Sequence, residues 1–104
     1  MLRLKGEMDA KSMADFQESN KKLNTVYWSI ERSLDSKSKK ELRDSQRAWL
    51  RYRDAEAKFE ANVFAQGGTV APVIYNECRA SVSDARVKEL HEAVKAWTES
   101  GSKR

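Results

Sequence analysis

The sequence is poor in the residues that build turns, disulfides and metal centres. Its 104 residues include one Pro, four Gly, one Cys and one His. So few Gly and Pro residues argue against an all-β fold, because such a fold needs many tight turns. The single cysteine, Cys78, cannot form an internal disulfide, so the cysteine content gives no indication of an oxidising compartment.

The chain also lacks a long apolar run. No stretch approaches the roughly 18 apolar residues of a transmembrane helix, so we expect no membrane span. The first seven residues, Met1 to Glu7, lack the apolar core of about 7–15 residues that a signal peptide requires. We therefore expect either a cytoplasmic protein or a protein whose export signal is missing from this chain.

Motifs for catalytic or metal chemistry are absent as well. The sequence contains no Cys-x-x-Cys, His-Glu-x-x-His or Glu-x-x-His pattern. Cys78 and His91 lie about 20 Å apart along a helix, too far for a nucleophile and its base. Gly67-Gly68 lacks the Lys and Ser/Thr of a phosphate-binding loop. We expect no catalytic residue, no metal and no cofactor, hence a non-enzyme, with His91 at the surface.

Helical periodicity is what the chain has instead. The first periodic segment runs from about residue 9 to residue 34, and Asp9 or Ser12 can cap its start. Its stripe follows a four-three spacing: Met13, Phe16, Asn20, Leu23, Tyr27, Ile30 and Leu34. We interpret Asn20 as a buried, hydrogen-bonded residue and expect Trp28, just beside the stripe, to be half exposed.

The second periodic segment runs from about residue 38 to residue 65. Ser38 and Glu41 match a capping box at its start, and Gly67 suits a left-handed cap at its end. Its predicted buried face carries Leu42, Trp49, Tyr52, Phe59 and Val63, with Gln46, Leu50, Arg53 and Ala57 beside them on the same face. Arg53 and Glu56 lie on or beside this stripe, so we expect each to have a partner inside the fold.

The third segment runs from about residue 71 to residue 99, with Pro72 in its first turn. Two overlapping apolar stripes can be drawn between residues 82 and 90, which leaves a kink or a split open. The prediction is an all-α antiparallel bundle of three long helices, forming one domain over 1–104 with an ordered core of about 9–99 and mobile termini. The expected aromatic core consists of Phe16, Tyr27, Trp49, Tyr52, Phe59 and Tyr75.

The positive charge of the chain is concentrated in its first half. The net charge is +4, and residues 1–52 hold twelve Lys or Arg against eight Asp or Glu. This half could bind an acidic protein or an anionic polymer, as a structural or adaptor module would. Nucleic-acid binding is a weaker alternative, because Glu41, Asp44 and Asp54 interrupt the basic ridge of the second helix.

One stretch resembles a known family. Gln46-Arg47-Ala48-Trp49-Leu50, followed by Tyr52-Arg53-Asp54-Ala55, resembles the signature helix of the LprI-type lysozyme inhibitors, a group of small exported bacterial proteins. Leu-Asn-x-x-Tyr in the first helix, the glycine turn and the spacing of Cys78, Arg86 and Leu90 extend the resemblance. The matching residues, mostly structural, are Leu23, Asn24, Tyr27, Gln46, Arg47, Trp49, Leu50, Tyr52, Arg53, Asp54, Gly68, Cys78, Arg86 and Leu90.

This resemblance implies an exported helical protein, periplasmic or secreted, without a cofactor. The function it implies is a non-catalytic inhibitor or immunity-type protein that occludes a lysozyme or another peptidoglycan hydrolase. The chain departs from the family at Ala57, where the family usually has a Cys, so Cys78 lacks its usual partners. The candidate partner-binding residues are Trp28, Trp97, Glu56 and Glu60. The two Trp residues could equally mark a homodimer seam.

Overall fold

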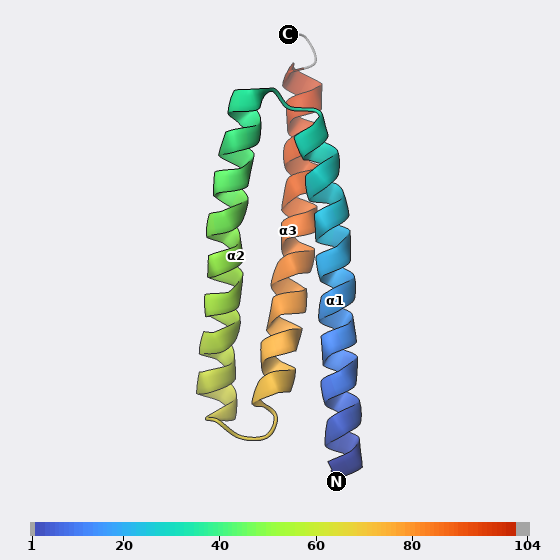
Figure 1. The fold of residues 1–104 in the computed structure, drawn as a ribbon, viewed down its shortest axis with the longest axis vertical. Coiled ribbons are helices and arrows are strands. Elements are labelled where there is room, and N and C mark those ends of the chain that lie inside the picture. Colours follow the sequence, from blue (N-terminus) through green and yellow to red (C-terminus); the bar gives the residue numbers. More distant parts are fainter. Residues whose placement is uncertain (1, 102–104) are drawn as a thin grey trace.

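The protein is a rod of three antiparallel helices, which confirms the predicted all-α bundle (Figure 1). The computed structural model describes the backbone of residues 2–101 and the side chains of residues 7–99. The helices are α1 (Leu2–Arg32), α2 (Ser36–Ala65) and α3 (Ala71–Gly101), and the rod measures 59 × 21 × 20 Å. No helix in this described part is long and apolar enough to cross a membrane.

α3 is the central helix of the rod. It packs against both α1 and α2, whereas the backbones of α1 and α2 remain further from each other (Figure 1). Small side chains allow α1 and α3 to approach closely, because Ser12 and Ser19 of α1 are buried, as are Ala80 and Ser83 of α3. The wider space between α1 and α2 is filled by long side chains instead.

α3 runs unbroken from Ala71 to Gly101, so the split that the sequence left open does not occur. The two overlapping stripes have another cause. A helix that contacts two neighbours buries two faces: Val73, Asn76, Ala80 and Ser83 form one stripe at steps of three and four, and the buried Cys78 lies on another face, beside Glu60 of α2. Periodicity analysis assumes one buried face, so it mistook the second face for a change of register.

The helix ends differ from the predictions in detail. α1 begins at Leu2, so the predicted mobile leader is helical from there on, while Met1 and residues 102–104 lie outside the described part. The N-cap of α2 is Asp35, whose carboxylate accepts a 2.8 Å hydrogen bond from the backbone N–H of Ser38. The left-handed cap of α2 begins at Gln66, one residue before the expected Gly67.

α2 is rotated relative to the prediction. The residues that it buries against the bundle are Gln46, Arg53, Ala57 and Ala61. Three of them, Gln46, Arg53 and Ala57, belong to the predicted face, but its other side points to solvent, because Tyr52 is 55% exposed, Phe59 56% and Val63 45%. The expected aromatic core is therefore wrong for Tyr52 and Phe59. Of that expected core, Phe16 and Tyr27 are the buried members, and Trp49 and Tyr75 are half-buried.

Candidate functional site

A buried arginine joins all three helices at the middle of the rod. The Arg53 guanidinium donates hydrogen bonds to Asn20 Oδ1 of α1 at 3.1 Å, to Ser83 Oγ of α3 at 3.5 Å and to Asp54 Oδ1 at 2.9 Å. Its charge is thus paired, as expected for Arg53, and Asn20 is hydrogen-bonded as predicted. This network fixes the spacing of α1 and α2, between which the candidate site lies.

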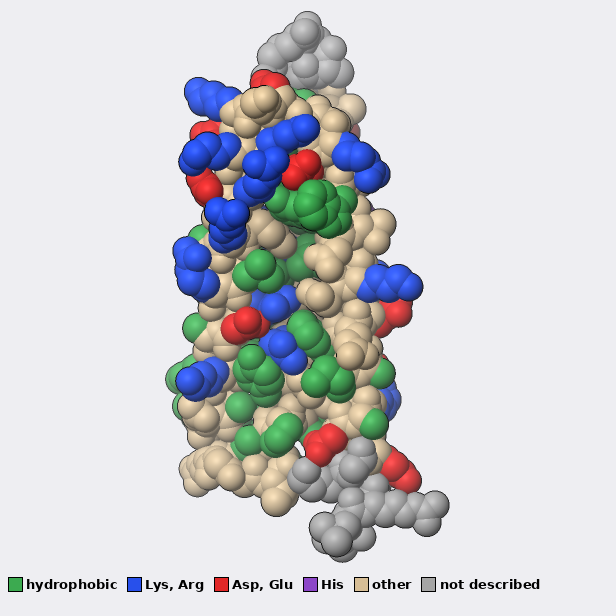
Figure 2. All heavy atoms as spheres, in the orientation of Figure 1, with side chains coloured by type: hydrophobic (Ala, Val, Ile, Leu, Met, Phe, Trp, Pro, Cys, Tyr) green, Lys and Arg blue, Asp and Glu red, His purple; other side chains and the backbone are tan. Residues whose placement is uncertain are grey.

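Arginines of α2 and α3 alternate with aromatic rings of α1 and α2 along the rod. The Arg53 guanidinium carbon lies 5.0 Å from the centre of the Phe16 ring and 5.4 Å from that of Trp49. Arg79 continues the series beyond Phe16 at 3.7 Å, and Arg86 continues it beyond Trp49 at 5.7 Å. Such contacts are favourable cation–π interactions. Basic and hydrophobic side chains accordingly alternate along the middle of the face in Figure 2.

An open groove of about 290 Å³ lies between α1 and α2, towards the turn that joins them. Its lining residues are Asn24, Tyr27, Trp28, Arg43, Gln46, Arg47 and Leu50. Trp28 is 52% exposed, as the sequence predicted, and packs edge-on against the buried ring of Tyr27, with 5.2 Å between the ring centres. The groove therefore presents the half-exposed ring of Trp28, which the buried Tyr27 ring holds in place.

The charges around the groove leave one cation available. Arg43 Nε lies 3.3 Å from Oε2 of the buried Glu31, so this guanidinium is paired within the fold. Arg47 is exposed and forms no hydrogen bond or ion pair within the described part of the chain. Burial, with the Glu31 carboxylate, raises the pKa of Tyr27, while Arg43 and Arg47 oppose the rise. The exposed Arg47 guanidinium, whose charge also helps to lower the pKa of the neighbouring Asp44 carboxyl, is available at the surface to an anionic partner.

The groove is lined with groups that are common at binding surfaces. It offers a half-exposed Trp, a free guanidinium and amide groups, with neither a nucleophile nor a carboxylate pair among its lining residues. No group of three His, Cys, Asp or Glu residues in the described part of the chain could hold a metal ion. The Cys78 thiol lies elsewhere, between α2 and α3. Its pKa is raised to about 11 by burial, by a hydrogen bond to Glu60 and by the charges of Glu60 and Glu56.

The structure does not bring the predicted partner-binding residues together. Trp28 lines the groove, whereas Trp97, 43% exposed on α3, does not. Glu60 is engaged by the Cys78 thiol, and Glu56 forms no hydrogen bond or ion pair in the described region. A separate groove between α1 and α3, of about 540 Å³, gathers other acidic residues: Asp15, Glu18, Glu77 and Asp84.

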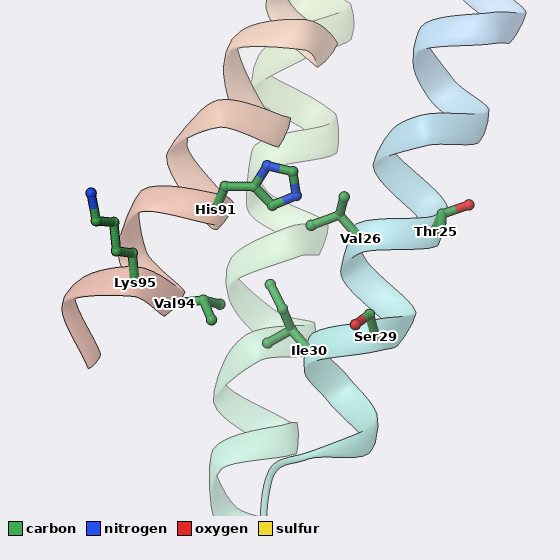
Figure 3. Close-up of a pocket in the computed structure, with 7 residues that line it drawn as sticks. All are labelled: Thr25, Val26, Ser29, Ile30, His91, Val94 and Lys95. Carbon is green, nitrogen blue, oxygen red and sulfur yellow. The ribbon is translucent and has the colours of Figure 1, made fainter. Parts of the chain in front are cut away.

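A further groove of about 440 Å³ lies between the C-terminal half of α1 and the C-terminal half of α3 (Figure 3). His91 points from α3 towards Val26 of α1, while Lys95 points away. Ile30 and Val94 add apolar surface. His91 is exposed, as predicted, and no acidic residue lines this groove. The α1–α2 groove is the stronger candidate because its exposed Trp adjoins a free cation.

The residues of the suspected family signature fall into two groups. Several lie in the interior: Leu23, Gln46, Arg53, Cys78 and Leu90 are buried, and Gln46 accepts a 3.2 Å hydrogen bond from Arg86. Gly68 belongs to the turn, where a Cβ would come within 3.0 Å of the Ala65 carbonyl oxygen. Others lie at the groove: Asn24, Tyr27, Arg47 and Leu50 line it, as Gln46 also does.

An ion pair at the groove escaped the sequence analysis. Arg43 lines the groove and pairs with Glu31, and both belong to neither the signature nor the predicted site. Their separation of twelve residues spans the α1–α2 turn, so no helical spacing rule connects them. Only the mutual placement of two helices brings them together.

Comparison with known proteins identifies the family of this chain. Residues 4–90 match the family described as Lysozyme inhibitor LprI, so the chain belongs to that family. It is also 29% identical over 84 residues to an uncharacterised protein of Rhizobium meliloti (strain 1021), a match covering 81% of this chain. The matched region is 56% of that relative's length. No solved structure matches the chain.

Proposed function

We propose that this protein is a non-catalytic inhibitor that binds a lysozyme or another peptidoglycan hydrolase and blocks its cleft. Membership of the LprI family supports a protein partner. The observation that carries the proposal is the groove in which Trp28 and the free Arg47 lie together. Trp, Tyr and Arg are the residue types most enriched among the residues that dominate binding energy at protein interfaces.

The free cation suits the proposed target. Glycoside hydrolases commonly use two carboxylates at the bond that they cleave. We propose that Arg47 forms an ion pair with one of these carboxylates while Trp28 covers the neighbouring substrate site. A basic hydrolase would be repelled at long range by the +4 charge of this chain, so recognition must rest on such short-range contacts.

The test is an inhibition assay against a panel of muramidases and cell-wall amidases. We expect dose-dependent inhibition of at least one enzyme, and at least a tenfold loss of affinity in Trp28→Ala and in Arg47→Ala, as for hot-spot residues. Trp97→Ala is the matched control, because Trp97 is similarly exposed but lies outside the groove. Absence of inhibition across the panel, or equal losses in all three variants, would contradict the proposal.

The proposal includes a location outside the cytoplasm. Members of the family are generally exported, so we propose a periplasmic or secreted protein. Fractionation of cells that express the full-length gene from its own start would test this. Recovery with the cytoplasmic fraction alone would contradict it.

A second candidate function, binding of an anionic polymer, is favoured by the basic end of the rod. Lys and Arg side chains gather around the α1–α2 end of the face in Figure 2, and Lys37, Lys39 and Lys40 begin α2 there. Such binding would weaken steeply as salt is added. Retention on a heparin column that Lys39→Ala/Lys40→Ala abolishes, without inhibition of any hydrolase, would favour this function over the first.

A further inference from the structure

α2 carries an apolar face that the bundle leaves uncovered. Tyr52, Phe59 and Val63 are each about half exposed, and Ala48 and Ala55 beside them are exposed too. Together they form one stripe along the helix, on the side away from the buried residues Arg53, Ala57 and Ala61. Contiguous exposed apolar surface of this kind marks an interaction site more often than isolated exposed residues do.

The stripe repeats every seven residues, as coiled-coil seams do. Its central positions, Ala48, Tyr52, Ala55, Phe59 and the polar Asn62, are separated by steps of four, three, four and three, and Val63 flanks the last of them. Tyr52 and Phe59 occupy equivalent positions one heptad apart. The alternating Ala residues are small enough for a second helix to approach closely. The pattern therefore fits a helix that pairs along its length.

The charges beside the stripe select a partner and an orientation. Arg51 precedes Tyr52 on one flank, and Glu56 follows Ala55 on the other. Neither forms an ion pair within the described part of the chain. In a parallel coiled coil, a residue that directly precedes a seam residue, as Arg51 precedes Tyr52, contacts the residue five positions further along the other helix. Arg51 would meet the partner's Glu56, twice by symmetry. An antiparallel pair would set like-charged flanks against each other.

We propose that the protein forms a parallel, two-fold symmetric homodimer through this outer face of α2. Tyr52 packs beside the partner's Tyr52 and Phe59 beside the partner's Phe59. The two Asn62 side chains hydrogen-bond across the seam and fix its register, as buried polar pairs do in coiled coils. An ion pair between Arg51 and the partner's Glu56 flanks the seam on each side. The α1–α2 groove lies outside the seam, so each copy keeps Trp28 accessible.

The expected dimer is of moderate strength. A fully buried Tyr or Phe side chain removes about 200 Å² from water, and Tyr52 and Phe59 are half exposed, so four rings bury on the order of 400 Å². With the remaining seam atoms, the interface lies near the lower limit of specific interfaces, about 1,200 Å² in total. We expect dissociation in the micromolar range, which a concentration series can follow.

Sedimentation equilibrium of the full chain, from about 1 to 500 μM, tests the dimer. The wild type should shift from monomer to dimer, and Phe59→Glu should remain monomeric throughout. Phe64→Glu is the matched control: Phe64 is 69% exposed on the same helix but lies off the stripe, so this variant should still dimerise. Circular dichroism checks that both variants are folded. A monomeric wild type, or equal effects of the two substitutions, would overturn the proposal.

Two further measurements test the parallel pairing. Arg51→Glu should weaken the dimer at least tenfold, and the double charge swap Arg51→Glu/Glu56→Arg should restore it. Ala48→Cys, in a Cys78→Ser background, should form a disulfide-linked dimer on mild oxidation, because parallel helices place the two positions opposite each other. A dimer that neither crosslinks at position 48 nor responds to the charge swap would overturn the parallel arrangement.

Discussion

The inner and outer faces of α2 carry side chains of opposite character. The inner face buries an arginine, a glutamine and two alanines: Arg53, Gln46, Ala57 and Ala61. The outer face exposes Tyr52, Phe59 and Val63 to solvent. Judged by hydrophobicity alone, the outer face of α2 would be expected to be buried and the inner face to be exposed. The contrast shows that α2 is positioned by hydrogen bonds and close approach, and that its apolar residues remain available for a partner.

The reason lies in what each face meets. α3 meets α2 through polar contacts, because Arg86 donates a hydrogen bond to Gln46 and Ser83 accepts one from Arg53. The Arg53 guanidinium finds two hydrogen-bond acceptors on other helices and two aromatic rings. A buried charge with such partners is stabilised, whereas a buried charge without them is costly. Substitutions on the inner and the outer face of α2 should therefore have very different effects on stability.

The largest expected effect is the loss of the inner arginine. Arg53→Ala removes a buried side chain and leaves the Asn20 and Ser83 oxygens without their donor. We expect the free energy of unfolding to fall by about 3 kcal/mol, from the cavity and the unpaired polar groups together. Urea unfolding followed by circular dichroism measures it. Arg47→Ala, at an exposed arginine of the same helix, should change stability by less than about 0.5 kcal/mol. Equal losses in the free energy of unfolding for Arg53→Ala and Arg47→Ala would contradict the prediction.

An intermediate effect is expected where Cys78 meets the inner side of α2. Its pKa is raised from 9.0 to about 11, so the stability linked to its protonation is complete below pH 9 and is lost as pH rises towards 11. The unfolded thiol ionises first, which lowers the free energy of unfolding by on the order of 2 kcal/mol across this range. Urea unfolding of wild type and Cys78→Ala at several alkaline pH values isolates this contribution. A pH-independent difference between them would contradict the prediction.

The smallest effect is expected at the outer face. In dilute solution, Tyr52→Ala and Phe59→Ala should each change the free energy of unfolding by less than about 0.5 kcal/mol, because these side chains contact mainly solvent. Leu23→Ala provides the contrast: Leu23 is fully buried, and its truncation should cost about 2–5 kcal/mol. A loss above 2 kcal/mol at Phe59 would show that the outer face is packed within the monomer.

Much of the candidate site could be recognised in the sequence, but not its assembly. Trp28 was expected to be half exposed because it lies just beside the stripe of its helix. The motif containing Arg47 placed that residue on the second helix. That these residues share a groove depends on the rotation of α2 about its axis, and helical spacing does not specify the angle between two helices. The Glu31–Arg43 pair was missed for the same reason.

The sequence by itself determined the three helices, their antiparallel order and the family. These features follow from local periodicity, turn chemistry and motif spacing, which depend on residues that are close together in the sequence. Only the tertiary structure decided which side of α2 lies inside, because its buried side carries Arg53 and Gln46 while hydrophobic periodicity favours the side with Tyr52 and Phe59. It also decided that α3 is a single helix with two buried faces. Burial depends on the neighbour a face meets, and that neighbour lies far away in the sequence.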